Sequence, residues 1–235
     1  MAEWVHGLGL TSKRFDYYIG SLLTEEKAKV SRLETMARDI GLPTYETCRF
    51  NLPAQQSKLL ETSRRLTRGS SWALALRISD EDSGTVVCRD LGLSVEQVEA
   101  AARSLPSKRT FVAVVSPYKT PAQSGSIVIA DGRALMEFVF GPHTQISKGR
   151  ASAHELFWCS YGPLKRTIEY STKNQTIRGV LHARFREAFK LLLGCEPKSA
   201  AEHTAHLYAE FHWHEDIGFR FIECSFSPAW TSSVK

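Results

Sequence analysis

The segment His206–Pro228, with the sequence HLYAEFHWHEDIGFRFIECSFSP, constrains the fold more than any other stretch of the chain. Alternating residues on both sides of a short acidic turn, closed by Gly218, predict an antiparallel β-hairpin. With a four-residue loop over 215–218, the predicted pairs are His214 with Phe219, Phe211 with Ile222, and Glu210 with Glu223. Two carboxylates directly opposite each other repel and destabilise a sheet, so this register needs a physical reason.

Two other interpretations of the same segment remain open. A three-residue loop moves the pairing by one residue and sends the two glutamates to different faces, where water solvates them. Alternation also places His212 and His214 on the face of Glu210, which suits a zinc site. No further spaced histidine or cysteine lies nearby to complete it.

Composition limits the class of protein. The 235 residues are 43% hydrophobic and 23% charged, which is typical of a globular protein with one large domain or two small lobes. No apolar run approaches the roughly 20 residues that span a bilayer, and the N-terminus lacks a signal-peptide pattern. Five scattered cysteines without a CxxC pair favour the reducing cytoplasm. A net charge of +5 favours anionic partners, although aromatic and basic residues do not interleave as in an RNA-binding sheet.

Hydrophobic periodicity predicts mixed helices and largely antiparallel strands, and therefore an α+β fold. Helices are expected over 24–40 and 55–66, after a capping box formed by Ser94 and Gln97, and over 176–194. Strands are expected at 71–79, 110–118, 124–130 and 134–141, with mixed strand and loop over 154–171.

The order of these pieces resembles the ATP-grasp superfamily. IGLPTYETCRF is similar to the segment ahead of that family's small nucleotide-binding lobe. SSWALALRIS with DEDSG, then LSVEQVEAAARSL, then FVAVVSPY resemble its phosphate-binding strand and loop, a helix, and the strand before its adenine-contacting hinge. AEFHWHEDIGFRFIECSFSP resembles its final hairpin with two acidic metal ligands. QSGSIVIADGRALMEFVFGPHTQISKG is most similar to the nucleotide-binding domain of phosphoenolpyruvate synthase and pyruvate phosphate dikinase.

The resemblance covers most of residues 34–230. It implies an ATP-grasp-like unit of two α+β lobes, residues 45–118 and 119–235, with mostly antiparallel sheets and the nucleotide between them. The implied function is an ATP- and Mg²⁺-dependent ligase or phosphotransferase that activates a small anionic acceptor, most often a carboxylate. The alternative is a non-catalytic nucleotide- or nucleic-acid-binding protein that retains the fold. Because no phosphohistidine domain follows, the full dikinase reaction calls for a protein partner that supplies a second catalytic domain.

The resemblance also implies roles for individual residues. The implied nucleotide ligands are Arg77, Lys119 and Lys148 for phosphates, Val115, Ser116, Pro117 and Tyr118 as the adenine hinge, and Glu137 for the ribose or the polar edge. Glu137 is equally well interpreted as a solvent-facing glutamate. The implied Mg²⁺ ligands are Glu210, Glu223 and Ser225.

Two further features bear on catalysis. Arg77 and Arg178 are the implied catalytic cations, and Arg178 begins a basic stripe with His182, Arg186 and Lys190 that either attracts the substrate or is simply solvated. The family's usual lysine is Arg77 here and its usual asparagine is Ser225, and both departures favour the non-catalytic alternative.

Overall fold

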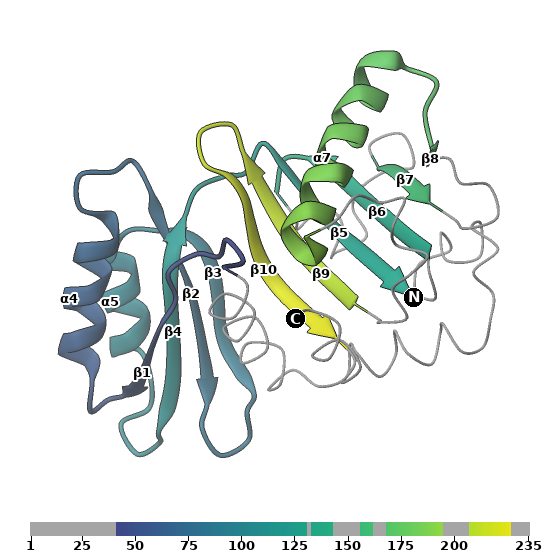
Figure 1. Ribbon diagram of the computed structural model, residues 1–235. Coiled ribbons are helices and arrows are strands. Elements are labelled where there is room, and N and C mark those ends of the chain that lie inside the picture. Colours follow the sequence, from purple (N-terminus) through teal and green to yellow (C-terminus); the bar gives the residue numbers. More distant parts are fainter. Residues whose placement is uncertain (1–40, 131–132, 143–155, 162–167, 195–206, 227–235) are drawn as a thin grey trace. The chain divides into compact units, whose positions relative to one another are not determined.

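The computed structural model describes residues 41–130, 133–142, 156–161, 168–194 and 207–226. The helix expected over 24–40 and Lys148 lie outside the described residues. Within them the fold is α+β, as the sequence predicts, and is built on two antiparallel sheets. The chain divides into a small unit, Tyr45–Thr120, and a large unit formed by the residues on both sides of it (Figure 1).

The small unit is a four-stranded sheet in the order β1-β4-β2-β3, with two helices on one face (Figure 1). Its elements are β1 Cys48–Leu52, α4 Gln56–Thr67, β2 Ala73–Asp80, β3 Val86–Leu93, α5 Val95–Arg103 and β4 Phe111–Tyr118. Alternate residues of β2, including Leu74, Leu76 and Ile78, pack against Leu59 of α4 and Val98 of α5. The period of two along the strand therefore places the apolar residues on the helix side.

The small unit contains one local feature that the sequence analysis predicted and one strand that it did not. The predicted capping box is present, because the Ser94 side chain accepts a hydrogen bond from the Gln97 N–H and the Gln97 side chain accepts one from the Ser94 N–H. Strand β3 was not predicted. It is an edge strand with mostly exposed residues, so its sequence carries no clear apolar alternation.

The large unit is a six-stranded sheet in the order β10-β9-β5-β6-β7-β8, and α7 lies across one face of it (Figure 1). Its elements are β5 Gln123–Ala130, β6 Arg133–Phe140, β7 Phe157–Tyr161, β8 Ile168–Tyr170, α7 Gln175–Leu193, β9 Leu207–His214 and β10 Gly218–Phe226. Helix α7 begins after Asn174, whose side-chain oxygen accepts hydrogen bonds from the N–H groups of Thr176 and Ile177. It ends at Gly194, which has a left-handed φ of 67°.

The two faces of the large sheet differ in chemistry. Ile127 of β5, Phe138 of β6 and Phe211 of β9 belong to the apolar core, together with Leu181 and Phe185 of α7. Residues that alternate with these face the other side, because successive side chains of a strand point to opposite faces. The face away from α7 is therefore the one that carries polar side chains at the centre of the sheet.

Within the described ranges, no helix is long and apolar enough to cross a membrane. No disulfide joins any two of Cys48, Cys88, Cys159 and Cys224.

Candidate functional site

The closing hairpin, β9 and β10, has a register that the sequence analysis did not foresee. The turn contains three residues, so that Gly218 pairs with His214, Phe219 with Trp213, and Phe221 with Phe211. The predicted pairs of His214 with Phe219 and of Phe211 with Ile222 are therefore wrong. The predicted pair of Glu210 with Glu223 is nevertheless present, because the register shifts between Phe221 and Glu223.

A β-bulge at Ile222 explains why the glutamate pair is present although the predicted register is wrong. Before the bulge, Phe219 and Phe221 point into the core on the α7 side. The extra residue reverses the alternation, so that Cys224 returns to the core and Glu223 points to the face of Glu210. The three-residue turn alone would have separated the two glutamates, and the bulge restores them to opposite positions on one face.

The paired glutamates belong to a longer row of polar residues across four strands. Ser126 of β5 lies opposite Glu210 of β9 on one side and opposite Glu137 of β6 on the other. We call Glu137, Ser126, Glu210 and Glu223 the carboxylate row. All four face away from α7, because their neighbours along each strand form the core.

Glu137 is the most deeply buried carboxylate of this row, with 5% of its surface exposed. The Ser126 hydroxyl donates a hydrogen bond to its Oε1 at 3.1 Å. Burial raises the pKa of Glu137 to about 7, the Ser126 hydrogen bond opposes that rise, and the nearby Glu210 carboxylate adds to it. The interpretation of Glu137 as a solvent-facing glutamate is therefore wrong.

Tyr208 positions the neighbouring carboxylate. Its hydroxyl donates a short hydrogen bond to Oε1 of Glu210, two residues along β9. Burial, followed by the charges of Glu210, Glu223 and Glu137, raises the pKa of Tyr208, so the phenol remains protonated and keeps donating. On β10 the Oε1 atom of Glu223 is buried. The row thus presents two facing carboxylates, one of them held by a phenol.

The histidines of β9 lie on the same face as the carboxylate row. His212 and His214 are 8% and 1% exposed, and their ring centroids are 6.3 Å apart. Among the described residues, no three His, Cys, Asp or Glu side chains are grouped so as to hold a metal ion. The described residues therefore supply no further ligand for a zinc site at the two histidines. The two carboxylates that lie opposite each other on this face are those of Glu210 and Glu223.

The small unit contains the residues implied for the adenine hinge and two of the three implied phosphate ligands, whereas Glu137 lies on β6 of the large unit. Arg77 lies on β2, opposite Val114 of β4 and Arg89 of β3, and is half-buried. Val115 is fully buried in the core, so any contact it makes with a base involves its backbone alone. Ser116, Pro117 and Tyr118 are partly buried at the end of β4 beyond its pairing with β1, and partly buried Lys119 follows them. Their roles toward a nucleotide remain predictions.

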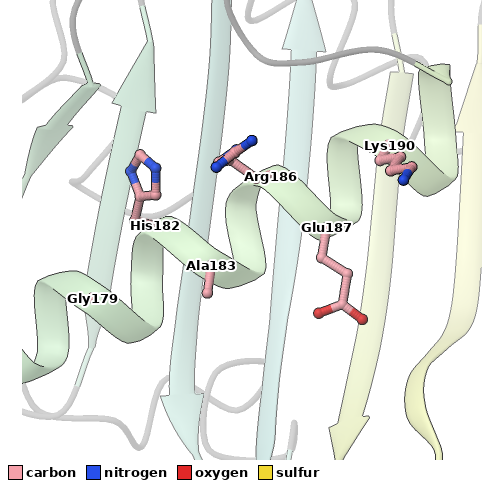
Figure 2. A pocket seen from close by; sticks show the side chains of 6 residues that line it. All are labelled: Gly179, His182, Ala183, Arg186, Glu187 and Lys190. Carbon is pink, nitrogen blue, oxygen red and sulfur yellow. The ribbon is translucent and has the colours of Figure 1, made fainter.

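The basic stripe lies on α7, on the other side of the large sheet from the carboxylate row. The Arg178 guanidinium sits 4.7 Å from the centre of the Tyr170 ring, and the Tyr170 hydroxyl is 2.7 Å from Nδ1 of His182. A hollow of about 510 Å³ lies on the outer face of α7. It is lined by Gly179, His182, Ala183, Arg186, Glu187 and Lys190, whose side chains are drawn in Figure 2. The fold does not bring Arg178 to the carboxylate row.

Ser225 lies two residues beyond Glu223 on β10, and its backbone pairs with that of Tyr208. Sequence reasoning missed Tyr208 and Ser126 as parts of this site. A signal for Tyr208 was present, because it precedes Glu210 by two residues on a predicted strand and therefore shares its face. Ser126 stood inside an apolar run, and only the strand order places it between two glutamates.

Comparison with known proteins gives a fold likeness only. No protein-family model and no curated protein matches the chain. It is similar to N5-carboxyaminoimidazole synthase from Aspergillus clavatus in complex with ADP (14% identity, TM-score 0.44, covering 83% of this chain and 43% of that one). It is also similar to macrocyclase MdnC from Microcystis aeruginosa bound with a precursor peptide (12%, 0.44, 83% and 51%). A third similar structure is D-alanine–D-alanine ligase from Bacillus anthracis complexed with ATP (14%, 0.42, 87% and 56%). The chain spans about half the length of these proteins, and at these TM-scores we draw no function from them.

Proposed function

We propose that this chain is an ATP-grasp-type enzyme that uses ATP and Mg²⁺ to activate a small anionic acceptor by phosphoryl transfer. A carboxylate acceptor, activated as an acyl phosphate in a ligase reaction, is the simplest case. The sequence resemblance to the dikinases keeps phosphotransfer to another group as the second form of the same proposal. One observation carries it: a bulge places Glu210 and Glu223 opposite each other on the polar face of the sheet.

The carboxylates of the row are of the kind that binds Mg²⁺ in proteins. Mg²⁺ is commonly held by one or two protein carboxylates and completes its shell with phosphate oxygens and water. Two facing carboxylates repel each other in a sheet, and a divalent cation between them removes that cost. When bound, Mg²⁺ neutralises the charge of the nucleotide phosphates during transfer.

The chain's own residues prepare the row for such a cation. The Tyr208 hydroxyl fixes one oxygen of Glu210, so this carboxylate is oriented before a ligand arrives. Burial raises the pKa of Glu137 to about 7, so this group is mostly protonated below that pH, which limits the negative charge of the row there. We propose that Arg77 of the small unit is a phosphate ligand, because the planar donors of a guanidinium match phosphate oxygens in pairs.

Exchange of one glutamate at a time tests the proposal. In EDTA, Glu210→Gln and Glu223→Gln should melt at or slightly above the temperature of the parent, because one of two like charges is gone. With Mg²⁺-ATP at 100 times Kd, the parent should gain about 2.7 kcal/mol of stability, and both variants should lose most of that gain. Turnover of ATP with candidate acceptors should fall strongly in both variants.

Glu215→Gln is the matched control, since Glu215 is exposed in the turn of the same hairpin. It removes the same charge and should respond to Mg²⁺-ATP as the parent does. Equal responses of all four proteins would overturn the paired-ligand site. A Mg²⁺-ATP response that depends on both glutamates, without turnover of any acceptor, would favour the non-catalytic alternative.

A further inference from the structure

The outer face of α7 combines a hollow with a row of positive charge, on the other side of the large sheet from the carboxylate row. The basic stripe runs along this face in steps of four residues, from Arg178 through His182 and Arg186 to Lys190. Figure 2 shows the last three of these side chains along one edge of the helix. Each step advances roughly 6 Å, so the stripe is about 18 Å long. Because side chains four residues apart form a ridge on a helix surface, the stripe is one continuous ridge.

A groove runs beside this ridge. It is formed by Gly179, Ala183 and Glu187, each of which lies three residues before a member of the stripe and is therefore its neighbour on the helix surface. Gly179 and Ala183 are both exposed and have almost no side chain, which leaves the space of the hollow above them. A Cβ added at Gly179 would meet nothing within 4 Å, so packing within the described residues does not require glycine there, although glycine is a poor helix former. A partner that approaches the helix closely does require it.

The charge of α7 is strongly one-sided. Its only acidic residue is Glu187, whose Oε2 atom lies 3.4 Å from Nη1 of Arg184. Three members of the stripe, Arg178, Arg186 and Lys190, carry a positive charge at neutral pH. A surface with this balance of charge attracts a partner of the opposite sign.

Tyr170 of β8 holds two members of the stripe in place. The Arg178 guanidinium lies over the Tyr170 ring, 4.7 Å from its centre, and the Tyr170 hydroxyl lies 2.7 Å from Nδ1 of His182. Side chains that are already fixed lose less freedom when a partner binds. This end of the stripe is therefore partly ordered in advance.

The chemistry of the same face favours an acidic protein segment over other anionic partners. The large apolar side chains that are exposed among the described residues lie on β3 and β6 rather than on α7, and a helix that lies in a membrane surface needs such side chains. The six residues that line the hollow include no Phe, Tyr or Trp on which the bases of a single strand could stack. A second copy of this chain would bring a second basic stripe, which repels the first.

We propose that the outer face of α7 docks an acidic helix of a protein partner, in which carboxylates recur every four residues. A ridge of the partner helix lies in the groove over Gly179 and Ala183, and its carboxylates lie beside Arg178, Arg186 and Lys190. Carboxylates four residues apart on a helix have the same spacing as the stripe, so the packing of ridge into groove and the ion pairs form together. This docking goes beyond the proposed function and requires neither ATP nor Mg²⁺.

The probe is a labelled alanine-based peptide of about 18 residues, long enough to form a helix, with a glutamate at every fourth position. One control peptide has the same composition with the glutamates rearranged around the helix, and another has glutamine in place of glutamate. Fluorescence anisotropy with the full chain measures binding at low salt and at about 0.15 M ionic strength. The regularly spaced peptide should bind, and more tightly at low salt. The rearranged peptide should bind more weakly, and the glutamine peptide should not bind.

Two variants separate the charge of the site from its shape. Lys190→Gln should lower the affinity for the regularly spaced peptide about two- to fivefold at low salt, as expected for one exposed ion pair. Gly179→Gln keeps every charge of the stripe and should fold, because the new side chain enters open space, but it fills the groove and should abolish binding. Lys58→Gln, at an exposed position of α4 in the small unit, is the matched control for charge and should bind as the parent does.

The outcomes that overturn the inference are distinct. Equal affinity of the parent and Gly179→Gln, or of the regularly spaced and rearranged peptides, would show that no helix packs into the groove. Binding of single-stranded RNA or of phosphatidylserine vesicles that Lys190→Gln weakens, in a parent that does not bind the peptide, would assign the stripe to another class of partner.

Discussion

Glu137 ties the charge of the carboxylate row to pH. Its pKa rises from an ordinary value of 4.5 to about 7, chiefly through burial. The folded protein therefore keeps a proton that the unfolded chain releases at lower pH. Between about pH 4.5 and 7 the folded state binds more protons, so this group lowers stability as the pH rises, by a total on the order of a few kcal/mol.

Glu137→Gln should remove that dependence, because the amide is nearly isosteric and carries no charge. In EDTA, the variant should become progressively more stable than the parent from pH 5 to pH 7, with a constant difference above pH 7. Urea unfolding at four pH values measures it. Glu169→Gln, at an exposed position of β8, is the control and should follow the parent. Parallel pH profiles of parent and Glu137→Gln would contradict the burial argument.

Arg49, Arg77 and Arg89, which lie in line across the small sheet, show what the sequence could not reveal at the residue scale. Arg77 was recognised because it lies near the end of an apolar strand that resembles a known motif. Arg49 and Arg89 carry the same chemistry but lie 28 and 12 residues away from it on the chain. Only the strand order β1-β4-β2-β3, which depends on long-range pairing, places the three in one line.

At the scale of the element, Gly125 fixes the approach of β5 to its neighbours. A Cβ at this position would lie 2.1 Å from the Glu137 carbonyl oxygen, 2.7 Å from Cζ of Phe211 and 2.8 Å from Cβ of Phe138. Neither a backbone atom nor a buried ring can yield by that much. Overpacking a core typically costs roughly 1–3 kcal/mol. Gly125→Ala should therefore destabilise the large unit by at least this amount.

Gly179→Ala is the matched comparison in the same unit. Gly179 lies in α7, and an added Cβ meets nothing within 4 Å. That substitution should stabilise the helix by roughly 1 kcal/mol, because glycine is a poor helix former. Thermal unfolding measures both changes, and the melting temperature should fall in Gly125→Ala and rise in Gly179→Ala. Equal melting temperatures would show that β5 adapts to a side chain at position 125.

The elements themselves were largely predictable, and the closing hairpin shows where this stops. Helix α7 and the strands β2, β4, β5 and β6 lie where hydrophobic periodicity places them, since one face of each must be buried. The bulge in β10 left a weaker signal: the adjacent apolar residues Phe221 and Ile222 interrupt the alternation. A four-residue turn without a bulge gives the same glutamate pair, so the correct pair followed from an incorrect register.

At the scale of the whole molecule, the described residues form two hydrophobic cores, one in each unit. Leu76 is 2% exposed in the small core and Leu181 is 0% exposed in the large one. Replacing a buried leucine with alanine costs roughly 2–5 kcal/mol. Because each core is packed by its own sheet and helices, we expect calorimetry to resolve two unfolding transitions rather than a single two-state transition.

The two leucine variants assign these transitions. Leu76→Ala should lower only one of them, and Leu181→Ala only the other, because each removes contacts from a single core. One transition that shifts as a whole in both variants would show that the cores unfold together.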